Sequence, residues 1–272
     1  MVAEYRETGR PAPAVFDTHA HVSARAFDKD RHEVLGRARD LGIVFLEVGF
    51  NEDSSRKALA LAEEAGGFCA VGIHPHDAMA DESLEARWQY IETLALQSPR
   101  VKAIGEIGLD YYRELSPKKA QADAFVMGLD LARRHRLPAI IHQRQCSWDV
   151  VSILEKHGCD IPLVFHCFSE GIDYARKCLD LGGYIGLGGP LTYPRNGYLR
   201  DMLKFLPPDR LLVETDCPWL PPQSKRGKRN EPAYIMEVIQ AIAGVLGRPP
   251  AEIMKLTFDN GVRVFAIGEG EW

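Results

Sequence analysis

The chain has 272 residues, of which 46% are hydrophobic and 26% are charged, and its formal net charge is −5 at pH 7. This composition is typical of a globular protein that is long enough to bury a large core without disulfide bonds. The acidic balance argues against a wide, sequence-independent surface for duplex nucleic acid, which would be basic, but it allows a local basic site.

The chain begins with a polar, proline-containing stretch, MVAEYRETGRPAPA, that resembles neither a signal peptide nor a membrane anchor. We expect residues 1–13 to form a loose arm and residues 14–272 to form one domain, since no linker, internal repeat or low-complexity block follows. Short apolar, β-branched runs then recur, as in buried parallel strands. The predicted strands are 15–22, 43–50, 68–74, 102–109, 138–143, 162–168, 184–189 and 210–216.

Segments with a 3.6-residue hydrophobic period separate these runs. The clearest cover residues 30–42, 117–137 and 171–183, and the last of them ends at glycines, as helices often do. Eight spaced strands, each followed by a helix, predict an α/β protein with a (β/α)8 TIM barrel. A doubly wound sheet is the alternative, but it would normally carry a glycine-rich phosphate turn after an early strand, and the sequence has none.

Histidines and carboxylates stand at the C-terminal ends of the predicted strands, where TIM barrels locate their chemistry. In FDTHAHV, His19 and His21 are two residues apart and would share one face of a strand. The later strands contribute His74, Glu106, His142, His166 and Asp216. Glu106 and Asp216 lie in apolar runs, where a buried carboxylate is costly unless a cation compensates it.

Six of these side chains suit a binuclear metal centre. One catalytic zinc ion needs only three protein ligands, whereas two divalent cations bridged by a carboxylate would use four imidazoles and two carboxylates. The predicted ligands are His19, His21, Glu106, His142, His166 and Asp216. Glu106 would be the bridge, and Asp216 would both bind a metal and accept a proton from the attacking water, with ligation alone as the alternative.

Two further residues are predicted to bind an anionic substrate. His74, in VGIHPH, is a strand-end donor suited to a phosphate oxygen, with a loop-stabilising hydrogen bond as its alternative role. Arg144 comes two residues after His142, and its planar guanidinium group fits phosphate, with a surface ion pair as the alternative.

The basic run SKRGKRNEP follows the last predicted strand and includes Arg226 and Lys228. Composition alone favours a solvated loop. However, Asn230 and Pro232 indicate a helix start, and a helix N-terminus beside basic side chains makes an anion site. We therefore predict that Arg226 and Lys228 contact the substrate backbone, weakly and in a salt-sensitive manner.

These motifs together resemble the TatD family of metal-dependent hydrolases, within the amidohydrolase-type barrels. The resemblance runs in order from about residue 15 to 265. It rests on HAH, VGIHPH, AIGEIGLDYY, the IIH-x-R stretch, FHCFSEG and ETDCPWLPPQSKRGKRNEPAY. Two stretches depart from the usual family pattern, namely Arg144-Gln145, where an Arg-Asp pair is common, and GLGGPLTYP after the seventh strand. These departures leave the ligand set intact and bear on substrate preference.

The resemblance implies a deoxyribonuclease that uses two divalent metal ions, Mg²⁺, Mn²⁺ or Zn²⁺, with 3′–5′ exonuclease activity in some members. It implies that nucleic acid, as single-stranded DNA or 3′ ends, is the substrate, and that the six predicted ligands match the metal-ligand positions of the family. An acyl or amide hydrolase, such as a D-aminoacyl-tRNA deacylase, is the alternative, because the same site could attack a carbonyl carbon. A non-catalytic binding module is a second alternative, which the complete ligand set disfavours.

Location follows from two further features of the sequence. No apolar run approaches the roughly 18 residues that a membrane-spanning helix needs, so we expect no membrane association. The six cysteines form no C-x-x-C pair, which indicates reduced thiols and a cytoplasmic protein.

Overall fold

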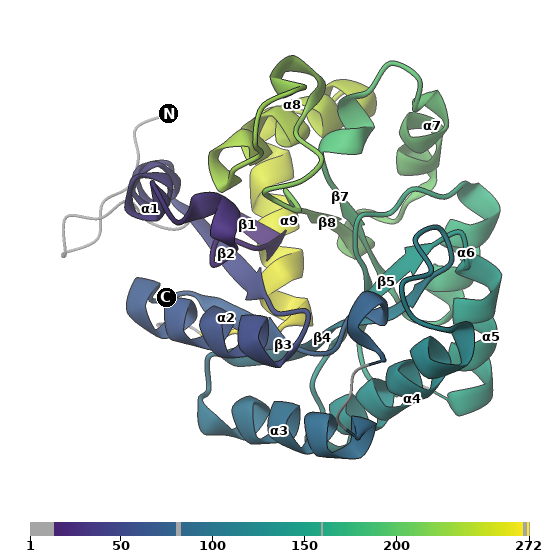
Figure 1. Ribbon diagram of the computed structural model, residues 1–272. Helices are drawn as coiled ribbons and strands as arrows, with labels where there is room; N and C mark the ends of the chain where they lie inside the picture. The colour runs from purple at the N-terminus through teal and green to yellow at the C-terminus, as the bar shows by residue number, and fades with distance from the viewer. Residues whose placement is uncertain (1–13, 80–82, 159, 269–270, 272) are drawn as a thin grey trace.

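The computed structural model describes residues 14–79, 83–158, 160–268 and 271. Its eight parallel strands form one sheet in the order β1 to β8, and the helices pack around the outside of this sheet (Figure 1). The predicted (β/α)8 barrel is therefore confirmed. The predicted arm at residues 1–13 lies outside the described residues, and the single domain over 14–272 stays a prediction.

The strands coincide with the eight apolar runs. They are β1 (Val15–Ala20), β2 (Ile43–Val48), β3 (Phe68–Val71), β4 (Val101–Asp110), β5 (Ala139–Arg144), β6 (Leu163–Phe165), β7 (Tyr184–Leu187) and β8 (Leu211–Val213). The α-helices are α1 (Arg31–Asp40), α2 (Glu52–Ala65), α3 (Leu84–Gln97), α4 (Lys118–His135), α5 (Ser147–His157), α6 (Ile172–Asp180), α7 (Gly197–Phe205), α8 (Ile235–Leu246) and α9 (Pro250–Val264). No helix among the described residues is both long and apolar enough to cross a membrane.

Six of the eight strands are shorter than predicted, namely β1, β2, β3, β6, β7 and β8. β1 ends before His21 and β3 ends before His74, so these two site residues follow their strands. At two further site residues the backbone itself turns. β6 ends before His166 and β8 ends before Asp216, so both residues lie in the loops that follow. Asp216 has a φ of +54°, and Cys167, next to His166, has a φ of +46°. These left-handed conformations are incompatible with a strand, so the chain turns at both places.

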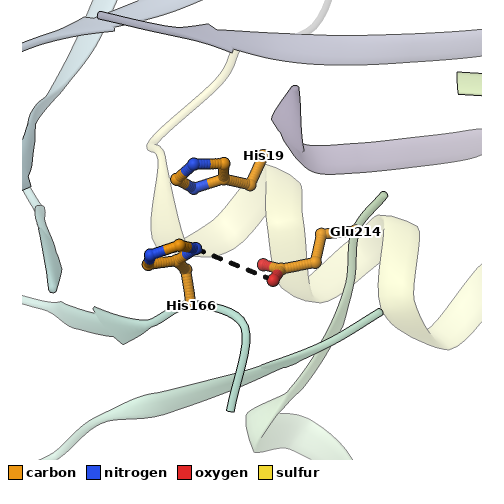
Figure 2. A group of neighbouring side chains, drawn as sticks. All are labelled: His19, His166 and Glu214. Carbon is orange, nitrogen blue, oxygen red and sulfur yellow. Dashed lines mark ion pairs between the residues drawn. The ribbon is translucent and has the colours of Figure 1, made fainter. Parts of the chain in front are cut away.

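The barrel interior is apolar toward the N-terminal ends of the strands and polar at its mouth, where the strands have their C-terminal ends. One apolar cluster collects buried side chains from all eight strands, together with Val264 and Phe265 at the end of α9. Every second side chain of a strand points to the same face. The residue two positions after each apolar inward residue therefore also points into the barrel, nearer its mouth. These residues are His142 after Ile140, His166 after Val164 and Glu214 after Leu212. Figure 2 shows that the side chains of His166, Glu214 and His19 face one another.

Hydrogen bonds between the first and last strands bring their polar ends together. The backbone N–H of Asp216 donates to the carbonyl of His19, and that of His21 donates to the carbonyl of Cys217, each at 2.9 Å. The buried carboxylate of Asp17 accepts from the backbone N–H of Thr215 at 2.9 Å and from its hydroxyl at 2.6 Å. These contacts nearly close the barrel and place His19 in β1, and His21 just after it, beside Asp216.

A glycine allows β4 and β5 to lie close together next to the site. Gly108 has a φ of +143°, and a Cβ atom added there would lie 2.0 Å from the carbonyl oxygen of His142. We expect Gly108→Ala to destabilise the protein by about 3 kcal/mol, because both the backbone conformation and the contact would be strained. Denaturant unfolding measures this loss.

The matched control is Gly244→Ala in α8, where an added Cβ would meet nothing within 4 Å. Alanine is the better helix former, so this change should stabilise the protein by up to about 1 kcal/mol. Similar unfolding free energies for the two variants would contradict the conclusion that glycine is needed at position 108 for the close contact between β4 and β5.

Candidate metal centre

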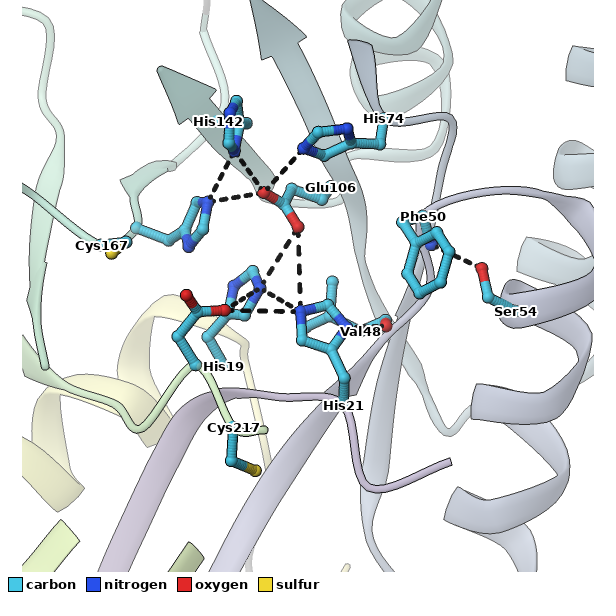
Figure 3. A network of polar contacts seen from close by, with 12 residues as sticks. His19, His21, Val48, Phe50, Ser54, His74, Glu106, His142, Cys167 and Cys217 are labelled. Atoms are coloured by element: carbon cyan, nitrogen blue, oxygen red, sulfur yellow. Dashed lines mark hydrogen bonds and ion pairs between the residues drawn. The ribbon is translucent and has the colours of Figure 1, made fainter. Parts of the chain in front are cut away.

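The six predicted ligands converge at the mouth of the barrel and form two groups that share Glu106. Figure 3 shows Glu106 between His142 on one side and His19 and His21 on the other. In the first group, Nε2 of His19 lies 3.0 Å from Nε2 of His21 and 3.4 Å from Oε2 of Glu106. Oδ1 of Asp216 lies 3.6 Å from Nε2 of His21 and 3.9 Å from Nε2 of His19. Four donor atoms thus face one small space, and they come from β1, the residue that follows β1, β4 and the loop after β8.

The second group surrounds the other oxygen of the same carboxylate. Oε1 of Glu106 lies 2.6 Å from Nδ1 of His142 and 2.7 Å from Nε2 of His166. The two imidazole nitrogens are 3.4 Å apart. Glu106 therefore presents one oxygen to each group, which is the arrangement that a bridging carboxylate requires.

Backbone partners settle which nitrogen of two histidines carries a proton. Nδ1 of His21 lies 2.7 Å from the carbonyl oxygen of Val48, which can only accept, so this nitrogen is protonated and Nε2 of neutral His21 has a free lone pair. Nδ1 of His74 accepts from the backbone N–H of His76 at 3.0 Å, so neutral His74 carries its proton on Nε2. His21 is thus prepared to bind a metal, whereas His74 is prepared to donate a hydrogen bond.

His74 would otherwise qualify as a ligand, because His74, Glu106 and His142 lie close enough to hold an ion. Nε2 of His74 is 3.4 Å from Oε1 of Glu106. Burial, with a contribution from neighbouring His142, lowers the pKa of His74 to about 4, so the side chain is neutral near pH 7. These observations favour the predicted role of His74 as a donor to substrate.

The electrostatics of the two groups fit bound cations. Burial and the adjacent imidazole of His166 lower the pKa of His19 to about 3, so His19 is a neutral donor. Burial disfavours the charged form of Glu106, but His166 and His74 outweigh this effect and hold its pKa well below the usual range. A neutral imidazole such as His19 beside the ionised carboxylate of Glu106 is a pair of ligand types that divalent zinc or manganese binds.

A carboxylate that the sequence reading missed orients His142. Oδ2 of Asp110 lies 3.2 Å from Nε2 of His142 and 2.9 Å from Nε2 of His76. Burial lowers the pKa of His142, but the hydrogen bonds to Asp110 and Glu106 outweigh it and raise the pKa to about 9. Asp110 could have been found from strand alternation, because it lies on the same face of β4 as Glu106.

The comparisons with known proteins agree with this geometry. A family model described as TatD related DNase matches residues 16–266. The chain belongs to the TatD family. The resemblance read from the motifs is thereby confirmed, and TatD-family proteins include enzymes named as metal-dependent hydrolases and exonucleases.

Two relatives and one solved structure illustrate the match. The uncharacterized metal-dependent hydrolase YabD of Bacillus subtilis is 38% identical over 256 residues, which cover 93% of this chain and 99% of YabD. The 3′-5′ ssDNA/RNA exonuclease TatD of a Rahnella species is 35% identical over 263 residues, which cover 93% of this chain and 98% of the relative. The crystal structure of YJJV, a TatD homologue from Escherichia coli, superposes with a TM-score of 0.86 at 29% identity and covers 94% of this chain and 99% of YJJV.

Arg144 lies at the rim of the TatD-type barrel, at the end of β5. Its guanidinium carbon is 3.9 Å from the centre of the Tyr112 ring, and both side chains are exposed. No ion pair of Arg144 is found among the described residues, so the surface ion pair considered from the sequence is not formed there. The stacked pair instead presents a positive charge and an aromatic face to solvent.

The basic loop after β8 contributes less positive charge than its sequence suggests. Arg229 pairs with Asp30 at 2.6 Å, and Lys225 lies 3.6 Å from Glu237. Arg226 is exposed and stacks over the ring of Tyr193 at 4.7 Å, and Lys228 is exposed. Within the described residues, neither Arg226 nor Lys228 forms an ion pair with the six predicted ligands, and the role of both in substrate binding stays a prediction.

The helix start predicted from Asn230 and Pro232 is confirmed at Pro232, but the capping residue is Glu231 and not Asn230. Asn230 is fully buried, and its side-chain amide donates to the carbonyls of Thr215 and Trp219 at 2.8 and 2.7 Å. A 3-10 helix begins at Pro232, covers Pro232–Tyr234 and leads directly into α8 at Ile235. The side chain of Asn230 holds the loop beside Asp216 and does not cap this helix. The anion site predicted at the helix start stays a prediction.

Proposed function

We propose that this TatD-family protein is a phosphodiesterase with two divalent cations and that it removes nucleotides from the 3′ ends of single-stranded nucleic acid. The observation that carries the proposal is the shared carboxylate of Glu106, which faces one group of donors with each oxygen. Such a paired site suits in-line displacement at phosphorus. The exonuclease named TatD from Rahnella, at 35% identity, supports the choice of substrate.

Each of the two groups of ligands would hold one cation. His19, His21 and Asp216 would hold one cation, His142 and His166 would hold the other, and Glu106 would bind both. When bound, the cations would supply Lewis acidity at the phosphate and make water acidic enough to attack near neutral pH.

The other groups act on the substrate directly. Asp216 lies at the edge of its group and would accept the proton of the attacking water, within hydrogen-bond reach of the same space. The Nε2–H of His74 would donate to a non-bridging phosphate oxygen and offset the charge that develops there. Arg144 and Tyr112 would receive the neighbouring nucleotide at the rim, by contact with phosphate and by stacking of the base.

The test is a cleavage assay of protein stripped of metal with a chelator and refilled with Mg²⁺, Mn²⁺ or Zn²⁺ in turn. The substrates are labelled single-stranded and double-stranded oligonucleotides, each with its label at the 5′ or the 3′ end. We expect no cleavage by the stripped protein, restored activity after refilling, and stepwise shortening of 5′-labelled single strands. Release of the amino acid from a D-aminoacyl-tRNA without cleavage of DNA or RNA would overturn the proposal in favour of an acyl hydrolase.

We expect Arg144→Ala to raise KM for single-stranded substrate about 10-fold and to change kcat little. The reason is that one charged contact to phosphate, about 1.4 kcal/mol, would be lost outside the reacting centre. Initial rates over a range of substrate concentrations measure this effect. The difference should narrow as salt is raised, because the contact is exposed.

The matched control is Arg248→Ala, on the connection between α8 and α9, where the arginine is also exposed. Its KM should equal that of the parent protein. Equal effects of the two substitutions would indicate a general loss of positive charge and would remove Arg144 from the binding site.

A cytoplasmic location is also part of this proposal. The five cysteines that the structure describes are all free, which supports a reducing compartment.

A further inference from the structure

Glu214 is a buried carboxylate that the proposed chemistry does not use. It lies just beyond β8 and is 0% exposed. Its Oε1 accepts a hydrogen bond from the backbone N–H of Cys167, whereas its Oε2 has no hydrogen-bond partner among the described residues. A buried acceptor without a hydrogen bond destabilises the folded protein unless a donor reaches it. The position of Glu214 therefore suggests a donor close to Oε2.

Two predicted metal ligands next to Glu214 also have a buried polar atom without a hydrogen-bond partner in the described part of the chain. These atoms are Nδ1 of His166 and Nδ1 of His19. Nδ1 of His166 lies 3.9 Å from Oε1 of Glu214, and the two imidazole rings are stacked with their centres 4.0 Å apart (Figure 2). One nitrogen or oxygen of each of the three residues lies within 4.8 Å of those of the other two.

The chemistry of these atoms is complementary. Nε2 of His19 and Nε2 of His166 both face Glu106, at 3.4 and 2.7 Å, so these are the nitrogens available to the cations. A neutral imidazole that uses the Nε2 lone pair carries its proton on Nδ1. Both Nδ1 atoms are then donors, and Glu214 is an acceptor. The same three residues do not suit a third cation, because each imidazole would have to be deprotonated at both nitrogens.

The neighbouring strand leaves room for this carboxylate. A Cβ atom added to Gly186 in β7 would lie 2.4 Å from Oε2 of Glu214. Any larger residue at this position would therefore push the carboxylate away from the imidazoles. Gly186 lies in β7, and Glu214 directly follows the adjacent strand β8, so the carboxylate occupies a space that the fold provides.

We propose that Glu214 is a positioning residue that accepts the Nδ1 protons of His166 and His19 and thereby aims the Nε2 lone pair of each at the metal centre. A movement of about 1 Å, or one bridging water molecule, completes the contact to His166. Because His19 belongs to one ligand group and His166 to the other, a single carboxylate orients a ligand of each cation. The inference rests on the proposed metal centre and not on the identity of the substrate.

The test compares Glu214→Gln with the parent protein in three measurements that involve no nuclease assay. Zinc affinity, measured by competition with a chromophoric chelator, should fall about 10- to 100-fold, as is usual when the hydrogen-bond partner of a histidine ligand is lost. In zinc-loaded protein with ¹⁵N-labelled histidine, the Nδ1–H resonances of His19 and His166 should shift and exchange faster with solvent. The thermal midpoint of the metal-free protein should not fall, since glutamine keeps the size of the side chain and its carbonyl oxygen can still accept from the backbone N–H of Cys167.

His21 is an internal control, because its Nδ1–H donates to Val48 and not to Glu214. Its resonance should be unchanged in Glu214→Gln. Gly186→Ala should weaken zinc binding in the same direction by displacing the carboxylate.

Zinc affinity within about threefold of the parent, with the resonances of His19 and His166 unchanged, would overturn the inference. Loss of all three resonances together with a lower metal-free midpoint would also overturn it, because a general structural role would then explain the loss of affinity. Failure to cleave nucleic acid, with these three results intact, would overturn only the proposed function.

Discussion

Glu106→Gln is expected to abolish hydrolysis and to weaken the binding of both cations at once. One oxygen of Glu106 faces His19, and the other faces His142 and His166. The amide has no charge, and its –NH₂ group replaces one of the two oxygens, so one of the two donor groups loses its shared oxygen. Because loss of a residue that merely orients a ligand costs up to about 100-fold in affinity, loss of a bridging ligand should exceed that figure.

Metal content after dialysis against zinc buffers, together with the cleavage rate of a single-stranded oligonucleotide, measures this expectation. The control is Glu231→Gln, which also replaces a buried carboxylate near the mouth of the barrel. Glu231 pairs with Arg37 at 2.7 Å and does not contact the six-residue cluster, so this variant should keep its metal and its rate. A Glu106→Gln protein that holds two metal ions per chain would remove Glu106 from the bridging position.

The strands and the six candidate ligands were predictable because each left a strong local signal. A carboxylate such as Glu106 inside an apolar run contradicts the preference for burying neutral groups, so it indicates a compensating cation wherever it occurs. The pair His19 and His21 has the spacing of side chains on one strand face. The closure of the barrel then brings such residues together, and their convergence follows from the fold class.

The residues that support the ligands left weaker signals, such as the strand alternation that places Asp110 on the same face as Glu106. Asp110 stands beside Tyr111 and Tyr112 at the end of a strand, where an acid is ordinarily solvated, and its contact to His142 depends on the register of β4 and β5. Glu214 precedes Asp216 by two residues, and its position toward His19 and His166 depends on Gly186. Asn230 was misread because an asparagine before a proline favours a helix cap, whereas tertiary hydrogen bonds to Thr215 and Trp219 decided its role. Such contacts between distant segments are set by packing, which local patterns do not encode.

His74→Ala is expected to slow hydrolysis about 10²- to 10³-fold while the protein keeps both cations. This is the usual cost of removing one donor to a developing negative charge. The prediction follows from the proton on Nε2 of His74, which the backbone N–H of His76 enforces by donating to Nδ1. Single-turnover rates and metal content, measured on the same preparation, test the two parts of the expectation.

The contrast with His21 makes the test decisive. His21 has the opposite tautomer, with Nδ1–H bound to Val48 and a lone pair on Nε2, so His21→Ala should lose metal as well as activity. His74→Gln places an amide N–H near the position of the imidazole N–H and should recover part of the lost rate, whereas His21→Gln should not restore metal content. If His74→Ala loses a cation, then His74 is a ligand, and the hydrogen bond from His76 must be absent in the metal-loaded protein.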